Sequence, residues 1–193
     1  MFDYIQGKIT ELNPTYVVLD SNGIGYLLHI TINTYSALKA EKVDKIFVHQ
    51  IIREDAHLLY GFKNPKEREV FRLLISVSGI GANTARMILS SLTPEEVAQA
   101  IAKDNIRMLQ SIKGIGAKTA QRMVVDLKDK IVKLQFSDEI FIPEYNTSVD
   151  EALSALVMLG FLKSHVEKAL SQITRETKGL SVEELIKRAL KVL

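Results

Sequence analysis

The segment Leu74–Leu89, with the sequence LISVSGIGANTARMIL, recurs 35 residues later as Leu109–Val124, with the sequence LQSIKGIGAKTAQRMV. Eight of the 16 aligned positions are identical and no gap is needed, whereas average composition gives about one identity by chance. Such a repeat indicates that one supersecondary unit is used twice. Each copy places Gly-Ile-Gly between two stretches with helical patterning, so the predicted unit is a helix, a tight turn and a second helix.

The Gly-Ile-Gly turns are candidate phosphate sites. Glycine tolerates positive φ and lets another backbone approach closely, and the isoleucine between the glycines can fill the gap between the two helices. The following helix begins with unpaired N–H groups and the positive end of its dipole, which together suit a phosphate oxygen. The predicted contact residues are Gly79, Ile80, Gly81, Asn83 and Thr84 in the first hairpin, and Lys113, Gly114, Ile115, Gly116, Lys118, Thr119 and Arg122 in the second.

The distribution of charge supports this interpretation. The net charge of +2 divides into −2 for residues 1–62, +6 for residues 63–135 and −2 for residues 136–193. A basic segment between two slightly acidic ones favours contact with a polyanion in the middle of the chain. One isolated Gly-x-Gly would more often be a plain connection between helices. Two copies in the basic third favour binding of the nucleic-acid backbone. Dinucleotide binding is disfavoured because no third glycine follows and the preceding segments are helical.

The flanking segments predict an α+β multidomain protein. Short β-branched runs around residues 16–19, 25–30, 45–52 and 57–62, with a turn at Asn22-Gly23, predict about five strands in an OB-fold barrel. Start signals at Asn64-Pro65 and Thr93-Pro94 predict helices, and capping boxes at Ser148 and Ser181 predict more. The expected parts are an OB-fold barrel over residues 1–63, an all-α tandem helix-hairpin-helix domain over 64–135, a linker over 136–147 and a three-helix module over 148–193.

Several classes of chemistry are disfavoured by composition. The chain has no cysteine, which excludes disulfides, cysteine zinc sites and cysteine nucleophiles and favours a reducing cytoplasm. Its four histidines are scattered without metal-ligand spacing, so no metal site and no cofactor is expected. The start of the chain has no signal-peptide pattern, and no apolar run is long enough for a membrane span. No Gly-x-x-x-x-Gly-Lys-Ser/Thr loop is present, so any ATP hydrolysis must come from a partner.

The order of barrel, tandem hairpins, linker and helical module resembles the RuvA family, the bacterial proteins that bind Holliday junctions. The resemblance covers essentially the whole chain and is most specific in Arg53–Phe62 (REDAHLLYGF) and Gly114–Ala120 (GIGAKTA). It implies a homotetramer that holds four-way junction DNA open and planar, with one or two tetramers on each junction. It also implies a non-catalytic subunit whose partners are a RuvB-like ATPase ring and a RuvC-like junction resolvase. The expected processes are branch migration in homologous recombination, DNA repair and the SOS response.

The resemblance also assigns roles to other residues. Glu54 and Asp55 match an acidic pin at the junction centre, although such a pair at a hairpin tip is more often a solvated turn. Contacts to the RuvB-like motor are expected from the C-terminal module, at Leu156, Leu159, Phe161 and Leu162. On the residues alone, these apolar side chains are more often core.

The first hairpin departs from the family pattern. It has Asn83 where many relatives carry lysine, so it is expected to rely on its backbone amides, with Arg86 as a possible additional cation. The linker is also short for the family.

Two other functions stay open at this point. The hairpins could dock a structure-specific nuclease or glycosylase, although no catalytic constellation stands out. They could also serve a general duplex-binding protein. Contacts to phosphates alone carry no base sequence information, so in every case binding is expected to be independent of sequence.

Overall fold

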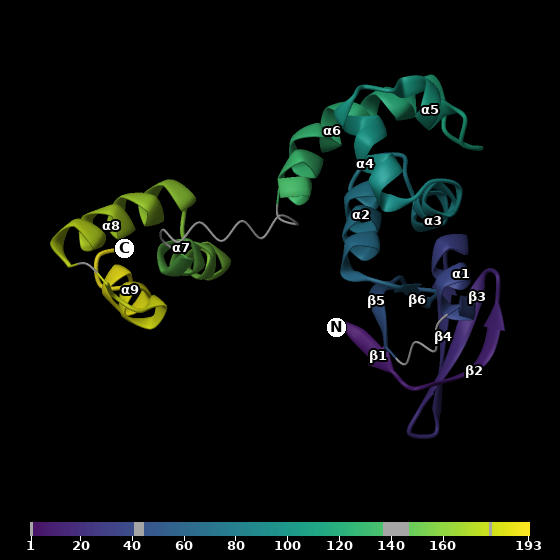
Figure 1. Ribbon diagram of the computed structural model, residues 1–193, viewed down its shortest axis with the longest axis horizontal. Helices are drawn as coiled ribbons and strands as arrows, with labels where there is room; N and C mark the ends of the chain where they lie inside the picture. Colours follow the sequence, from purple (N-terminus) through teal and green to yellow (C-terminus); the bar gives the residue numbers. More distant parts are fainter. Residues whose placement is uncertain (1, 41–44, 137–146, 178) are drawn as a thin grey trace. The chain divides into compact units, whose positions relative to one another are not determined.

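The computed structural model describes residues 2–40, 45–136, 147–177 and 179–193 (Figure 1). The chain forms two compact units, Met1–Asp138 and Glu139–Leu193. The first unit contains a β-barrel and a set of helices, and the second contains helices. The architecture confirms the predicted α+β multidomain class.

The barrel is a six-stranded sheet in the order β1-β5-β6-β4-β3-β2. Its strands are β1 (Tyr4–Gln6), β2 (Lys8–Asn13), β3 (Tyr16–Ser21), β4 (Ile24–Ile30), β5 (Lys45–Ile52) and β6 (His57–Phe62). Only the β4–β6 pair is parallel among these neighbours. The outermost strands β1 and β2 are separated in the chain by Gly7 alone, so one bent strand closes the barrel. A side chain cannot replace the hydrogen of Gly7, because a Cβ there would lie 2.2 Å from the carbonyl oxygen of Asp20.

The barrel core follows the alternation of strands, in which every second side chain points inward. Val17, Leu19, Leu28, Ile46 and Val48 are all fully buried in it. The helix α1 (Ile32–Ala40) connects β4 to β5 and was not predicted. Its sequence, INTYSALKA, includes residues of modest helix propensity and has little amphipathic character. Contacts with the rest of the fold therefore decide its conformation.

The helical part of the first unit surrounds one core. It comprises α2 (Pro65–Ile75), α3 (Ala82–Ser91), α4 (Pro94–Ala102), α5 (Ile106–Gln110) and α6 (Ala117–Phe136). Both predicted start signals are confirmed. Asn64 caps α2 by accepting a hydrogen bond from the Glu67 amide, and Thr93 forms a capping box with Glu96 at the start of α4.

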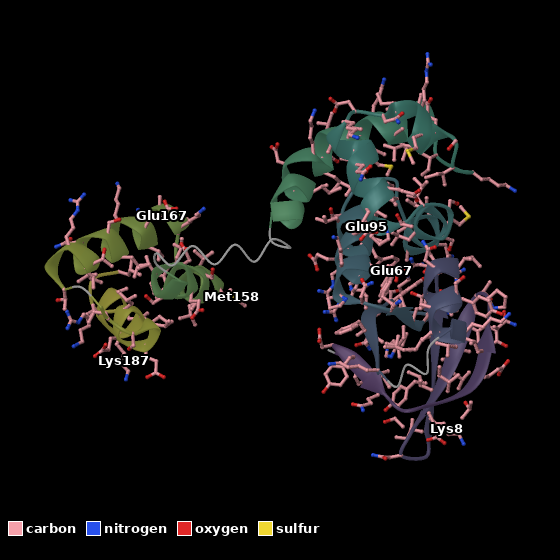
Figure 2. All side chains as sticks on the ribbon, in the orientation of Figure 1. Lys8, Glu67, Glu95, Met158, Glu167 and Lys187 are labelled. Carbon is pink, nitrogen blue, oxygen red and sulfur yellow. The ribbon has the colours of Figure 1, made fainter. Side chains whose placement is uncertain are left out.

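Two adjacent charged residues of α2 fasten the helices to the barrel. Glu67 is buried (Figure 2), and its carboxylate accepts hydrogen bonds from the hydroxyls of Thr31 at 2.5 Å and Thr34 at 2.7 Å. Burial raises the pKa of the Glu67 carboxyl above its ordinary value, and these hydrogen bonds oppose part of the rise. Nη1 of Arg68 donates to the carbonyl and the carboxylate of Asp3, each at 2.6 Å. Barrel and helices are thus joined by buried and partly buried polar contacts as well as by the apolar core.

The second unit is the predicted three-helix module, formed by α7 (Thr147–Met158), α8 (Lys163–Glu176) and α9 (Val182–Ala189). Its core includes Ala152, Leu156, Val166, Leu170, Ile173, Leu185 and Ala189. The capping box at Ser181 is confirmed. Helix α7 begins at Thr147 rather than after a cap at Ser148, so Ser148 lies in its first turn.

Phe136, at the start of the predicted linker, is the last residue of α6, and residues 137–146 lie outside the described residues. No helix in the described ranges combines the length and apolar character that a membrane crossing requires.

Candidate nucleic-acid interface

The two Gly-Ile-Gly turns have the same backbone geometry. In the first, the amide of Ile80 donates to the carbonyl of Val77 at 3.0 Å, and in the second, the amide of Ile115 donates to the carbonyl of Ile112 at 3.1 Å. The first glycine of each pair has positive φ, +92° and +89° respectively. The predicted helix–turn–helix unit is therefore present twice. Both isoleucines are nearly buried, 4% and 5% exposed, and fill the space between helices as expected.

The second glycine of each pair faces open space. A Cβ on Gly81 or Gly116 would meet no atom within 4 Å, and neither residue has positive φ. The fold therefore does not require glycine at these positions. Helical hydrogen bonding starts only after them, with the Ala85 amide donating to Gly81 and the Ala120 amide donating to Gly116, both at 2.9 Å. The amides of the residues between, 82–84 and 117–119, lack acceptors within their helices.

The two hairpins contact each other at equivalent positions of the repeat. Nη1 of Arg122, in α6, donates to the carbonyl of Ser78 in the first turn at 3.2 Å. Met87, in α3, is the residue equivalent to Arg122. The Cε atom of Met87 lies 3.7 Å from where a Cβ on Gly114 would stand. Each hairpin helix thus reaches the turn of the other copy.

Positive charge is concentrated at the second hairpin. Lys113, Lys118 and Arg122 are exposed there, at the positions that Ser78, Asn83 and Met87 occupy in the first copy. Within the described residues, none of these three cations has a carboxylate within ion-pair distance. Their charge is uncompensated and available to an anionic ligand.

Arg86 is the candidate additional cation of the first hairpin. Its Nη1 instead donates to the carbonyl of Thr15, in the turn between β2 and β3, at 3.2 Å. The side chain of Arg86 is therefore engaged with the barrel.

Glu54 and Asp55 lie at the tip of the β5–β6 hairpin. The Arg53 amide donates to the carbonyl of Ala56 at 2.8 Å and closes the turn, and both acidic side chains are exposed. Close to the tip, Ile51 and Leu58 pack against the core of the helical part. This places the base of the tip on the helical domain, in the same compact unit as the Gly-Ile-Gly turns.

The apolar residues predicted to bind a motor fall into two groups. Leu156 is fully buried and Phe161 packs against the core of the second unit, so these two side chains stabilise the module itself. Leu159 and Leu162 are 63% and 67% exposed. Sequence reasoning missed Met158, which is 88% exposed at the end of α7 (Figure 2). Met158 lies two residues after Leu156, outside the i, i+4 spacing of the core residues Ala152 and Leu156. This position in the sequence could have predicted that its side chain is exposed.

Among the described residues there is no group of three or more His, Cys, Asp or Glu side chains able to hold a metal ion. The described surface presents cations at the second hairpin, an acidic tip on the barrel, and the exposed apolar side chains of Met158, Leu159 and Leu162 on the second unit.

These features define a tandem helix-hairpin-helix protein with a β-barrel and a separate helical module. The chain matches the family models "RuvA N terminal domain" over residues 1–61, "SAM-like Helix-hairpin-helix tandem" over 71–129 and "RuvA, C-terminal domain" over 147–193. The chain belongs to the RuvA family.

Full-length relatives support this assignment. The chain is 49% identical over 193 residues to a protein of Christiangramia forsetii, and 50% identical over 193 residues to one of Flavobacterium psychrophilum. It is 51% identical over 197 aligned residues to one of Parabacteroides distasonis. In each case 100% of both chains is covered, and each relative is described as "Holliday junction branch migration complex subunit RuvA".

Proposed function

We propose that this chain binds four-way Holliday junction DNA, as a non-catalytic subunit of a branch migration complex. The observation that carries the proposal is the pair of hairpins, each with an open glycine position in front of unpaired helix amides. Backbone amides and lysine or arginine side chains recognise phosphates without reading bases. Contacts of this kind let a junction move through any sequence.

The proposed DNA contacts are the residues predicted from the repeat, which are Gly79, Ile80, Gly81, Asn83, Thr84, Lys113, Gly114, Ile115, Gly116, Lys118, Thr119 and Arg122. The two isoleucines act by filling the turns, because their side chains are nearly buried. The second hairpin supplies most of the electrostatic attraction, since its three cations have no matched cations in the first.

The acidic tip is proposed to face the crossover of the junction. Carboxylates near phosphates repel them, so Glu54 and Asp55 would disfavour re-pairing at the centre and guide the separated strands outward. Neither carboxylate forms an ion pair within the described part of the chain, so their charge is not neutralised internally.

The second unit is proposed to recruit a RuvB-like ATPase ring through its exposed apolar residues Met158, Leu159 and Leu162. The chain contains no phosphate-binding loop of its own, so the partner would supply ATP hydrolysis. We further propose a homotetramer, a RuvC-like resolvase as a second partner, and a cytoplasmic location. The proposed domain boundaries are those predicted from the sequence.

Competition binding tests the proposal. The purified chain is titrated with a labelled four-way junction against linear duplex of the same length at fixed salt, because affinity depends on salt. A marked preference for the junction is expected. Equal affinity would instead favour general duplex binding. Cleavage of either DNA in the presence of Mg²⁺ would point to a nuclease.

A further inference from the structure

The first hairpin is anchored to the barrel through α3. Nδ2 of Asn33 donates to the carbonyls of Leu89 at 2.6 Å and Leu92 at 3.2 Å, at the end of this helix. The amide of Ile32 donates to the hydroxyl of Ser90 at 3.1 Å. Together with the bond from Arg86 to Thr15, these contacts hold α3 against the barrel at several points along its length.

The second hairpin is not anchored in this way. In the described residues, no hydrogen bond or ion pair joins α5 or α6 to a barrel strand or to α1. Its polar link to the first hairpin is the bond from Arg122 to the carbonyl of Ser78. That carbonyl belongs to the peptide group leading into Gly79, which has φ +92°. Arg122 therefore holds the peptide group that determines the shape of the first turn.

We propose that Arg122 is a positioning residue that fixes the first turn relative to the second, so that both hairpins engage one DNA molecule together. This rests on the proposed DNA binding. Two linked contacts strengthen each other only when their spacing matches the spacing on the ligand. A guanidinium has five N–H donors in a rigid plane, so it can hold a carbonyl and keep donors and charge for a phosphate. Lysine keeps the charge but carries it on a flexible stem as a compact ammonium.

Comparison of the two copies of the repeat distinguishes the positioning role of Arg122 from the effect of its charge. The equivalent residue, Met87, also lies at the turn of the other copy but carries no charge. Contact between the hairpins is thus common to both copies, while the hydrogen bond to a turn carbonyl belongs to Arg122. Lys118 lies one helical turn before Arg122 on α6, and its side chain forms no hydrogen bond or ion pair within the described chain. Lys118 is therefore a control cation on the same helix that makes no hydrogen bond to the first turn.

A double-mutant cycle tests the proposal. Arg122→Lys is measured alone and together with Gly81→Val, which is designed to block the proposed first phosphate site and whose Cβ would meet no atom within 4 Å. Alone, Arg122→Lys is expected to weaken DNA binding about tenfold, and with Gly81→Val to weaken it by less than about twofold, because there is no longer a first contact to align. The control, Lys118→Met, should lower affinity by the same factor in both backgrounds. Equal effects of Arg122→Lys in both backgrounds would overturn the proposal.

A second measurement uses the protein without DNA. The methyl resonance of Ile80, inside the first turn, should shift in Arg122→Lys and stay in place in Lys118→Met. An unmoved Ile80 resonance in Arg122→Lys would also overturn the positioning role. The cycle is run on junction and linear duplex in parallel. The preference of the wild-type protein for junction over duplex tests the proposed function. The coupling between Arg122→Lys and Gly81→Val tests the positioning role of Arg122.

Discussion

At the scale of single residues, the two glycines of each hairpin have different reasons to be glycine. Gly79 and Gly114 have positive φ, which is costly for any residue with a Cβ. Gly81 and Gly116 have neither that conformation nor a close neighbour. For the second glycine the fold supplies neither reason, and the reason we propose is a ligand that comes close to the backbone.

This difference separates folding from binding in the second hairpin. Gly116→Val should change the free energy of unfolding by no more than about 1 kcal/mol and weaken junction binding at least about tenfold by blocking the phosphate. Gly114→Val should cost about 1–2 kcal/mol of stability, because it forces a branched side chain into positive φ. Thermal unfolding and a binding titration on both variants check the expectation. Tight binding by Gly116→Val would refute phosphate docking at this turn.

Glu67 gives a prediction for pH. Burial raises the folded-state pKa of this carboxyl above its ordinary value of 4.5. The unfolded chain therefore ionises first as pH rises, so stability linked to Glu67 is fully present below about 4.5 and declines as pH rises through the folded-state pKa. As pH rises through that interval, the unfolding free energy of wild type should fall relative to that of Glu67→Gln. Above the interval, the difference between the two should stay constant. Denaturant unfolding at a series of pH values measures it. A difference that stays constant, or that moves in favour of wild type, would contradict the assignment.

At the scale of elements, the sequence was most informative where the signals are local. The Asn64 and Thr93 starts were found because the cap, the proline and the glutamate lie within four residues of each other. Helix α1 was missed because its stability comes from distant partners. Asn33 bonds to α3, and Thr31 and Thr34 bond to Glu67. The single long strand bent at Gly7 was missed for the same reason, since the approach of Asp20 is not visible in sequence.

The candidate site followed the same rule. The repeat located both turns, because identity at a fixed spacing needs no knowledge of the fold. The repeat could not reveal the hydrogen bonds from Arg122 to the carbonyl of Ser78 and from Arg86 to the carbonyl of Thr15. Both bonds join residues that are far apart in the chain. Among the apolar residues of the second unit, periodicity alone could not separate the core residue Leu156 from the exposed Leu159.

The β5–β6 hairpin tip carries a prediction at this scale. Glu54→Gln with Asp55→Asn should leave the fold unchanged, because both side chains are exposed and have no ion-pair partner among the described residues. Junction binding should be retained or strengthened as repulsion of phosphates is removed, while branch migration driven by a RuvB-like ATPase should change. Gel-shift titration and a branch migration assay measure the two effects. Glu151→Gln, an exposed acid of the second unit, serves as the control. A large loss of binding would refute the repulsive role.

At the scale of the whole molecule, the hairpin cations and the exposed apolar residues at the end of α7 belong to different units. The hairpin cations Lys113, Lys118 and Arg122 belong to Met1–Asp138, whereas Glu139–Leu193 has a core of its own and exposes Met158, Leu159 and Leu162. Because each unit has its own core, a surface change in the second should leave the hairpins of the first intact. Binding of DNA and recruitment of a motor should therefore be separable by mutation.

Leu159→Ser with Leu162→Ser tests this separation. Both side chains are more than half exposed, so the change should cost less than about 1 kcal/mol of stability. It should weaken binding of a RuvB-like ATPase at least about tenfold and leave junction affinity unchanged. Calorimetry with the ATPase and a junction titration measure the two effects. Leu156→Ala provides the comparison, because emptying a fully buried site should destabilise the second unit by about 2–5 kcal/mol. Undiminished ATPase binding by the double variant would place the motor contact elsewhere on the chain. A loss of junction affinity would mean that the second unit contributes to DNA binding.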